Sequence, residues 1–472
     1  MANSADPSFA PVVLPSREDA FVRASSEVIG GPAGRRVHPA SGWWTPLRVM
    51  LALCVLAGAL AFIVKEPCRE DAWTQGDQYR HACYSDVPIL YTLRGLERGA
   101  VPYLDSKGAD VVEYPVLTGL AMWITAKIVD AVDTSGNPLE RTRRYFDVNV
   151  LLFTGLLMLT TAMTVQLVGR RPWDAAMIPL APGLILAGTI NWDMVAVALA
   201  TGGLLAWARK KPLLAGVLFG LGAAAKLYPL FIIGPLLILC LREKRLREWT
   251  VMFAAGAAAW LVVNIPIAKA APDAWWTFYK LSRERPASFG SIWYSLSRHG
   301  HAVPPDKLNL VAGGLFVALC VGIAVLAWKA PRRPRVGQLT FLVVAAFLLT
   351  NKVYSPQYVV WLVALYPLAR PRWSEFLIWQ AAEVAYFFAA WLHIEGLNRP
   401  ELVIPDWPHD LATVLRMAAE LWICALIVRD IVRVDTDPVR NDGLPGEVDD
   451  PVGGVLIEAQ PQPHRHAQPL PA

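Results

Sequence analysis

Long apolar segments recur along most of this chain and constrain its fold more than any other feature. Of its 472 residues, 55% are hydrophobic and only 18% are charged, whereas soluble domains carry about 25% charged residues. A charged side chain at the centre of a bilayer costs roughly 2.5–3.5 kcal/mol on insertion scales. Because helices satisfy their own backbone hydrogen bonds in lipid, the sequence predicts an all-α polytopic membrane protein.

The apolar segments predict a bundle of about twelve transmembrane helices. The predicted spans are residues 47–64, 145–168, 174–190, 194–208, 212–225, 227–241, 249–268, 309–328, 338–350, 356–370, 374–392 and 411–428. Several of these segments are shorter than the roughly 20 residues that cross a bilayer. Short spans next to polar breaks are typical of helix ends that line a water-filled cavity.

Basic residues in the short connections set the predicted orientation, because Lys and Arg are enriched on the cytoplasmic side. The basic connections are Arg170-Arg171, 209–211, 242–247, 329–335 and Arg370–Arg372. All of them face the cytoplasm, together with both termini, if residues 115–133 do not cross. We therefore expect 115–133, which contains Lys127 and Asp130, to be an amphipathic helix on the outer interface. Residues 65–144 then form one large external loop.

Two terminal arms flank the predicted membrane domain of residues 47–432. Residues 1–46 are rich in Pro, Ser, Arg and Gly, and residues 433–472 are acidic and then rich in Pro, Gln and His. We expect both arms to be disordered and cytoplasmic. The net charge of +5 is the excess that cytoplasmic Lys and Arg give a membrane protein, so it predicts no nucleic-acid partner.

Two of the six cysteines, Cys68 and Cys83, lie in the large polar loop rather than in an apolar segment. A disulfide between them is expected if that loop faces an oxidising compartment. The chain has no CxxC and no Walker, GxGxxG, GxSxG or HExxH motif. We therefore predict no cofactor and assign no metal ligand, while dependence on a divalent metal stays open.

Three polar clusters interrupt the apolar segments on the predicted external side: Asn191-Trp192-Asp193, 226–229 and 352–358. Asp193 has two interpretations, as the cap of the next helix or as a side chain in a cavity. Lys226 either extends to the interface or provides a fixed positive charge for a phosphate. The predicted phosphate- and substrate-binding residues are Lys226, Tyr228, Asp193, Arg144, Arg283, Lys352 and Gln357.

The large external loop supplies the candidate catalytic carboxylates. Asp86 is the first choice as a general base, because burial beside lipid would raise its pKa; Asp77 and Glu113 follow. Helix capping by Ser85-Asp86 is the alternative. In the same topology Arg144 and its neighbours face outward, against the charge rule, and an anionic ligand would explain them. The 269–308 loop, with Arg283, mixes aromatic and basic residues, which suits sugar phosphates or an ordinary interfacial belt equally.

These residues resemble a known family over roughly residues 47–430. The matching residues are Ser85-Asp86, Tyr91, Gly95, Pro102-Tyr103, Glu113-Tyr114-Pro115, Asn191, Asp193, Lys226, Pro229, Asn351-Lys352 and Ser355-Pro356-Gln357-Tyr358. They are similar to the actinobacterial polyprenyl-phosphate-mannose-dependent mannosyltransferases of glycosyltransferase family 87, which have the GT-C fold. The family often has a second proline where this chain has Val116.

The resemblance implies a plasma-membrane enzyme with an external active site, in which Asp86 is the acidic residue of the first loop. It implies a polyprenyl phosphosugar donor and inversion at the anomeric carbon. The acceptor does not carry over from the resemblance; we expect a glycan or lipid of the cell envelope. Mannose is the expected hexose, and arabinose stays open. The alternative function is a transporter or lipid-linked sugar flippase, although transporters place their sites near the membrane midplane and show internal repeats.

Overall fold

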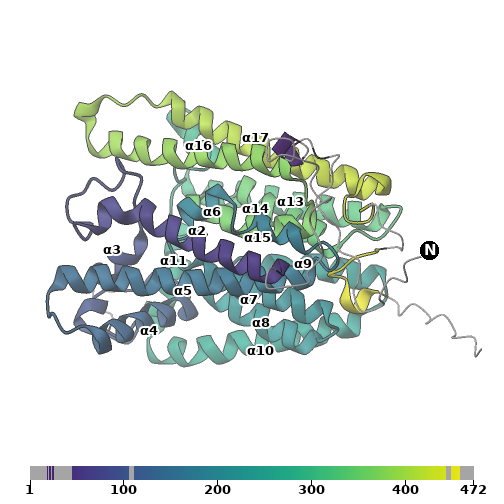
Figure 1. The fold of residues 1–472 in the computed structure, drawn as a ribbon, viewed down its shortest axis with the longest axis horizontal. Coiled ribbons are helices and arrows are strands. Elements are labelled where there is room, and N and C mark those ends of the chain that lie inside the picture. Colours follow the sequence, from purple (N-terminus) through teal and green to yellow (C-terminus); the bar gives the residue numbers. More distant parts are fainter. Residues whose placement is uncertain are drawn as a thin grey trace, which may run out of the picture.

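The computed structural model describes residues 19, 21–22, 24–25, 45–105, 111–442 and 448–457. These residues form a bundle of helices and contain no strand (Figure 1). Six helices are long and apolar enough to cross a membrane: α2 (Pro46–Arg69), α5 (Pro138–Leu167), α10 (Leu246–Ala270), α13 (Pro305–Lys329), α16 (Trp373–Asn398) and α17 (Trp407–Val432). The prediction of an all-helical, multi-pass membrane protein is confirmed.

Most of the shorter apolar helices are more deeply buried than the long ones. The shorter helices are α7 (Asp193–Ala208), α8 (Pro212–Ala225), α9 (Leu230–Arg242), α14 (Val336–Thr350) and α15 (Val359–Ala369). Every residue of α15 is buried, whereas only 11% of the apolar window of α10 or α13 is buried. A helix that is apolar all round is stable where neighbouring helices cover it, so these short helices end inside the protein and their polar termini can meet there.

One predicted span is not a continuous helix. Residues 174–190 contain the 3₁₀ helix η3 (Pro172–Met177) and the six-residue α6 (Pro182–Ala187). Pro182 restricts the preceding residue, and Ala181 is extended, with φ −71° and ψ 113°. The apolar sequence therefore folds as two short pieces.

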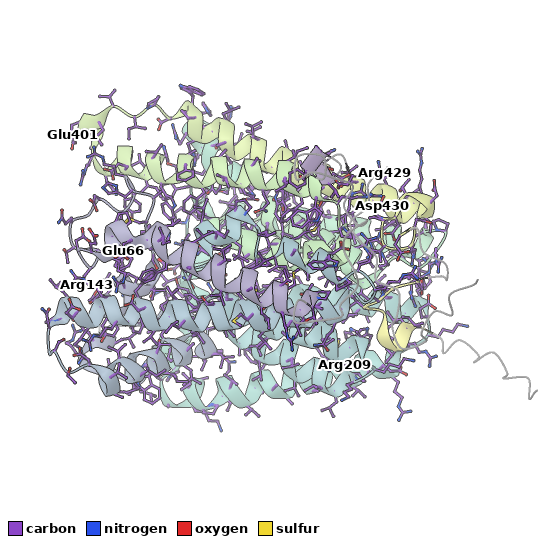
Figure 2. All side chains as sticks on the ribbon, viewed as in Figure 1. Glu66, Arg143, Arg209, Glu401, Arg429 and Asp430 are labelled. Carbon is purple, nitrogen blue, oxygen red and sulfur yellow. A yellow bond between two sulfur atoms is a disulfide. The ribbon has the colours of Figure 1, made fainter. Side chains whose placement is uncertain are left out.

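The bundle has two ends that differ in what they carry. Glu66, Arg143 and Glu401 lie at one end, and Arg209, Arg429 and Asp430 lie at the other (Figure 2). We call the first the loop end and the second the tail end. The loop end carries α3 (Asp86–Leu93), η1 (Leu96–Arg98), α4 (Val116–Val132), α11 (Pro272–Glu284), α12 (Ile292–Arg298) and η5 (Pro400–Leu402).

Helix α4 forms where the sequence predicts an amphipathic helix, at residues 115–133. It packs against α5 and α8. The Thr118 hydroxyl donates a hydrogen bond of 2.7 Å to the carbonyl of Ala225, the last residue of α8. This contact joins the first large loop to the break between α8 and α9.

The described part of the C-terminal segment is packed against the tail end, whereas the sequence predicts a disordered tail. It includes η6 (Val434–Thr436) and η7 (Gly454–Leu456), and the Asp437 carboxylate accepts two bonds from the Arg335 guanidinium, at 2.8 and 3.0 Å. Asp442 binds Arg170 at the same end. The basic turns supply partners for these acids, so the C-terminal segment packs against the bundle although it contains few apolar residues. Residues 443–447 and 458–472, and most of the 1–46 arm, lie outside the described residues.

Candidate active site

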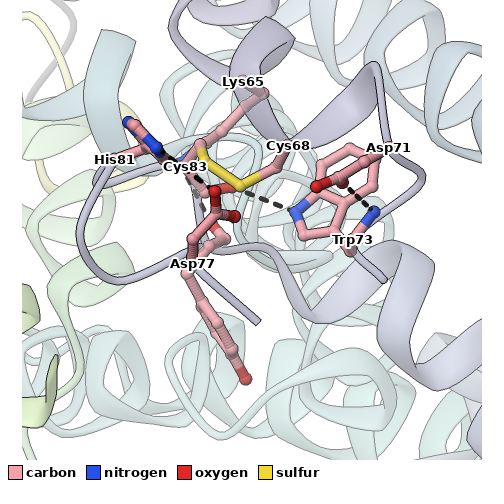
Figure 3. The surroundings of a disulfide bond; sticks show 8 residues. Lys65, Cys68, Asp71, Trp73, Asp77, His81 and Cys83 are labelled. Atoms are coloured by element: carbon pink, nitrogen blue, oxygen red, sulfur yellow. Dashed lines mark hydrogen bonds and ion pairs between the residues drawn. A yellow bond between two sulfur atoms is a disulfide. The ribbon is translucent and has the colours of Figure 1, made fainter. Parts of the chain in front are cut away.

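A disulfide joins Cys68, near the end of α2, to Cys83 (Figure 3). Two further bonds hold the chain next to it: the Lys65 ammonium donates to the Tyr84 carbonyl at 3.0 Å, and the Trp73 indole donates to the Cys83 carbonyl at 3.1 Å. Lys65 is fully buried. Together these contacts fix the backbone that leads into α3.

Asp86 is the first residue of α3, and Ser85 is the residue that caps it. The Ser85 hydroxyl accepts the N–H of the residue two positions on, at 3.2 Å. The Asp86 carboxylate is therefore not needed as a cap. Its Oδ1 accepts the Tyr84 hydroxyl at 2.5 Å, and its Oδ2 accepts the Asn191 amide at 2.7 Å and the Tyr114 hydroxyl at 3.5 Å. The alternative of helix capping by Ser85-Asp86 is thus confirmed for Ser85 and wrong for Asp86.

The surroundings of Asp86 raise the pKa of its carboxyl group. Burial is the largest cause; hydrogen bonds from Tyr84 and Asn191 and the charge of Lys226 oppose it without cancelling it. The donors in contact with Asp86 are uncharged, so the carboxylate keeps its negative charge largely uncompensated. A carboxylate in this setting is a stronger base than a solvated one, as a general base requires.

Lys226 lies at the break between α8 and α9, where its backbone is extended, with φ −152° and ψ 157°. Its ammonium is 3.3 Å from Oδ2 of Asp193 and 4.9 Å from the centre of the Tyr114 ring. The residue is only 9% exposed. Lys226 therefore points into the protein rather than extending along its surface to the membrane interface.

Asp193 is the first residue of α7, and Trp192 occupies the cap position. Asp193 Oδ1 accepts the Trp361 indole N–H at 2.8 Å. The Trp361 ring stacks with Tyr228, at 5.4 Å between centroids, and with Tyr358, at 4.5 Å. The Tyr228 hydroxyl is buried and has no hydrogen-bond partner within the described part of the chain. The clusters that contain Asp193, Tyr228 and Tyr358 thus meet.

The side chain of Lys352 contacts the backbone of Arg283. The Lys352 ammonium donates to the Arg283 carbonyl at 2.8 Å, while the Arg283 side chain is exposed at the end of α11. Burial, and then the charge of Arg285, lower the pKa of Lys352. Arg285 also acts electrostatically on the Tyr358 hydroxyl. Arg285 is exposed, and its charge reaches both Lys352 and Tyr358.

Gln357 is buried at the start of the 3₁₀ helix η4 (Pro356–Tyr358). Its side-chain oxygen accepts the Ser355 hydroxyl at 2.5 Å. This bond closes the turn that carries Tyr358 against Trp361, so Gln357 shapes the site through its neighbours.

The two other candidate carboxylates have partners of their own. Asp77 pairs with His81 at 3.2 Å beside the disulfide (Figure 3). Glu113 accepts two bonds from the Arg94 guanidinium, at 2.7 and 2.8 Å. Glu113 acts on Asp86 only through its charge.

Arg144 binds away from Asp86, in the turn between α4 and α5. Its guanidinium is 3.1 Å from Asp133 and 3.2 Å from the Val132 carbonyl. Its neighbour Arg143 is paired with Glu140. The protein itself thus supplies acceptors for these outward-facing arginines.

The site contains residues that the sequence analysis did not select. Asn191 and Tyr114 stand inside the motifs that carry the family resemblance, so position in a motif was a usable signal. Trp361 had none, because it is an aromatic residue in an apolar stretch. Tyr84 stands in the polar loop directly before Ser85-Asp86, so its position next to a matched motif was a usable signal as well. Across the described ranges, no group of three or more His, Cys, Asp or Glu side chains could hold a metal ion.

No curated protein matches this chain. Among solved structures, the chain is similar to ArnT from Cupriavidus metallidurans, crystallised with bound undecaprenyl phosphate. The identity is 13%, the match covers 82% of this chain and 78% of that one, and the TM-score is 0.43. The family model of glycosyltransferase family 87 matches residues 114–356, which is more than half of the chain and includes Tyr114, Asn191, Asp193, Lys226 and Lys352. The chain belongs to glycosyltransferase family 87.

Proposed function

We propose that this membrane glycosyltransferase moves a hexose from a polyprenyl phosphate donor to an envelope glycan or glycolipid, with Asp86 as the general base. The observation that carries the proposal is that Asp86 and Lys226 both contact the same residue, Tyr114. Tyr114 directs its hydroxyl toward Asp86 and its ring face toward the Lys226 ammonium. A basic carboxylate and a cation are thus held one aromatic side chain apart, a spacing on the scale of one sugar phosphate.

The reaction follows from this arrangement. The acceptor hydroxyl gives its proton to Asp86, and its oxygen forms a bond to the anomeric carbon of the donor sugar. The bond from that carbon to the phosphate oxygen breaks, and its electron pair leaves with the polyprenyl phosphate. Lys226 stabilises the negative charge that develops on the leaving phosphate. Attack opposite the leaving group inverts the anomeric carbon.

The pairing of Lys226 with Asp193 keeps the ammonium in place before the donor arrives. Asp193 is itself held by Trp361, so the cation sits on a rigid support. An ammonium has three donors, and one carboxylate contact leaves others for a phosphate. The buried Tyr228 hydroxyl, without a partner in the described structure, is a further donor beside the same rings.

The loop end is the external face in this proposal. The basic turns at 170–171, 209–211, 329–335 and 370–372 lie at the opposite, tail end, and the charge rule places that end in the cytoplasm. Mannose is the proposed sugar because the residues shared with the mannosyltransferases include Asp86, Asn191 and Lys226. A site at the helix ends favours an enzyme over a flippase.

The test uses purified full-length protein in lipid vesicles with a labelled polyprenyl-phosphate-mannose and a detergent extract of the source membranes as acceptor. The wild type should form a labelled glycan or glycolipid. Asp86→Asn should lower the rate of transfer by about 10²–10⁴-fold, the usual contribution of a general base, while the protein stays folded by size-exclusion chromatography.

Asp77→Asn is the matched control, because Asp77 is a carboxylate of the same loop that pairs with His81. It should keep most of the transfer activity. Polyprenyl-phosphate-arabinose in place of the mannose donor tests the sugar. Near-normal transfer by Asp86→Asn would remove the assignment of the base, and a wild type that only moves the donor across the vesicle membrane would favour the flippase.

A further inference from the structure

Three aromatic rings pack together beside Oδ1 of Asp86, whereas Tyr114, whose ring lies under the Lys226 ammonium, contacts Oδ2. Tyr79 and Tyr84 are stacked at 5.4 Å between ring centroids, and Trp391 of α16 is 5.7 Å from Tyr79 and 4.9 Å from Tyr84. Tyr84 is also the residue that donates to Oδ1 of Asp86. We call these three rings the aromatic cluster.

Two buried polar groups near the aromatic cluster have unused hydrogen-bonding capacity within the described residues. The Trp391 indole N–H is buried and donates to no acceptor, and the residue is 4% exposed. Glu395, one turn further along α16, is 1% exposed, and both of its carboxylate oxygens accept no hydrogen bond. Arg399 forms an ion pair with Glu395, at 3.4 Å between its guanidinium and Oε1. Buried polar groups are normally satisfied, so a ligand is the natural partner for this pair.

The charges of Glu395 and Asp86 both act on the hydroxyl group of Tyr79. Burial, and then the charges of Asp86 and Glu395, raise the pKa of Tyr79. The Tyr79 hydroxyl therefore lies within electrostatic reach of both carboxylates. This links the α16 residues to the reacting carboxylate through one side chain.

The chemistry of this region differs from that around Lys226. The positive charge of Lys226 suits a phosphate. Beside the aromatic cluster the available groups are a carboxylate, an indole N–H and ring faces. Such a set suits an uncharged sugar ring, whose C–H face packs on aromatic side chains and whose hydroxyls donate to carboxylates and accept from N–H groups. A second phosphate would meet the negative charge of Glu395.

We propose that Tyr79, Tyr84, Trp391 and Glu395 form the acceptor subsite, and that the acceptor presents a neutral sugar ring rather than a charged or purely lipid group. This rests on the proposed function. The sugar packs on the aromatic cluster, Glu395 and the Trp391 indole bind its hydroxyls, and the reacting hydroxyl reaches Asp86 on the Oδ1 side. The two oxygens of Asp86 then divide the site, with Oδ1 toward the acceptor and Oδ2 toward the donor.

The experiment measures two half-saturation values with the same purified enzyme in vesicles. One is for labelled polyprenyl-phosphate-mannose, and the other is for the detergent extract of source membranes, titrated as the acceptor. Glu395→Gln keeps the shape of the side chain but replaces the charged carboxylate, which accepts a hydrogen bond from a sugar hydroxyl, by a neutral amide. It should raise the acceptor value about tenfold and leave the donor value within twofold. Trp391→Phe, which keeps an aromatic ring and removes the N–H, should shift the acceptor value in the same direction by less.

Glu401→Gln is the control, because Glu401 is an exposed carboxylate of η5 at the same end of the bundle. It should change neither value. Treating the extract with periodate, which cleaves the vicinal diols of sugars, should abolish its acceptor activity. An unchanged acceptor value in Glu395→Gln, an equal rise in the donor value, or survival of acceptor activity after periodate would overturn the subsite. A wild type without Asp86-dependent transfer would instead overturn the proposed function.

Discussion

The loop end and the tail end of the bundle both bury carboxylates, and they surround them with different partners. Asp86 is held by uncharged donors, and burial leaves the pKa of its carboxyl group raised. Asp437 is buried as well, which by itself raises its pKa, but the charge and hydrogen bonds of Arg335 outweigh burial and leave it lowered. A carboxylate surrounded by neutral donors keeps its basicity for chemistry, whereas one neutralised by a guanidinium holds two segments together.

The largest expected difference between the ends is in stability. Asp437→Asn leaves the buried Arg335 without its counter-charge, and breaking a buried ion pair in this way costs roughly 3–5 kcal/mol. Asp86→Asn keeps neutral neighbours and should change the free energy of unfolding by less than about 1 kcal/mol. Unfolding in mixtures of detergent and sodium dodecyl sulfate measures both. Equal losses would show that the two carboxylates have the same structural role.

The Cys68–Cys83 disulfide stabilises the loop end by a covalent cross-link, in contrast to the ion pairs of the tail end. Replacing both Cys68 and Cys83 by Ser removes a cross-link between residues 15 positions apart, worth about 3 kcal/mol in the chain-entropy model. Transfer activity should fall as well, because the bond fixes the segment before Asp86. Double replacement of the buried Cys54 and Cys240, which form no disulfide, by Ala is the control. A full rate in the Cys68/Cys83 variant would mean that Lys65 and Trp73 position the segment alone.

Tyr84→Phe tests how a neutral hydrogen-bond donor at the loop end affects the pKa of Asp86. The hydrogen bond from Tyr84 lowers the pKa of Asp86, so its removal raises that pKa further, and the base form is lost at a higher pH. The acid limb of the pH profile of kcat/KM should therefore move to higher pH. Tyr366→Phe, at the tail end, is the matched control and should not move it. A downward shift would contradict the assignment of Asp86 as the base.

The smallest effect is expected at Arg144. Its guanidinium is bound in the α4–α5 turn, so Arg144→Gln should change the half-saturation value for polyprenyl-phosphate-mannose by less than twofold. Lys226→Gln, measured beside it, should raise that value at least tenfold, because a charge-assisted bond to the phosphate is lost. A large effect at Arg144 would place the donor phosphate near that turn instead.

Much of the fold could be predicted because it rests on local patterns. Apolar runs located the membrane helices, and the polar breaks at Asp193, Lys226 and Gln357 marked where short helices end inside the protein. The co-location of Asp86, Asp193 and Lys226 followed from topology, since a charge count along the chain put them on one side. The continuous span at 174–190 was not observed, because Pro182 divides an otherwise apolar stretch.

The rest depended on pairings between distant residues, which hydropathy does not report. Asp437 and Arg335 lie 102 positions apart, so an acidic tail with few apolar residues looked disordered. Asp86 looked like a helix cap because Ser85 and Asp86 are adjacent and both are capping residues. Trp361, in an apolar stretch, could not be told from a packing residue until the structure showed its hydrogen bond to Asp193.

The packed segments of residues 433–442 and 448–457 have a consequence for biogenesis. Arg170, Arg335 and Arg370 belong to turns that are far apart in sequence, and each is paired with an acid from residues 430–442. Those acids leave the ribosome after every membrane helix except the end of α17 has been made. During synthesis the three turns therefore lack these acids, although Arg370 already has Glu375 as a local partner. A nascent chain that stops early lacks the contacts that join the turns to the C-terminal segment. The last part of the described chain to be translated closes the tail end of the bundle.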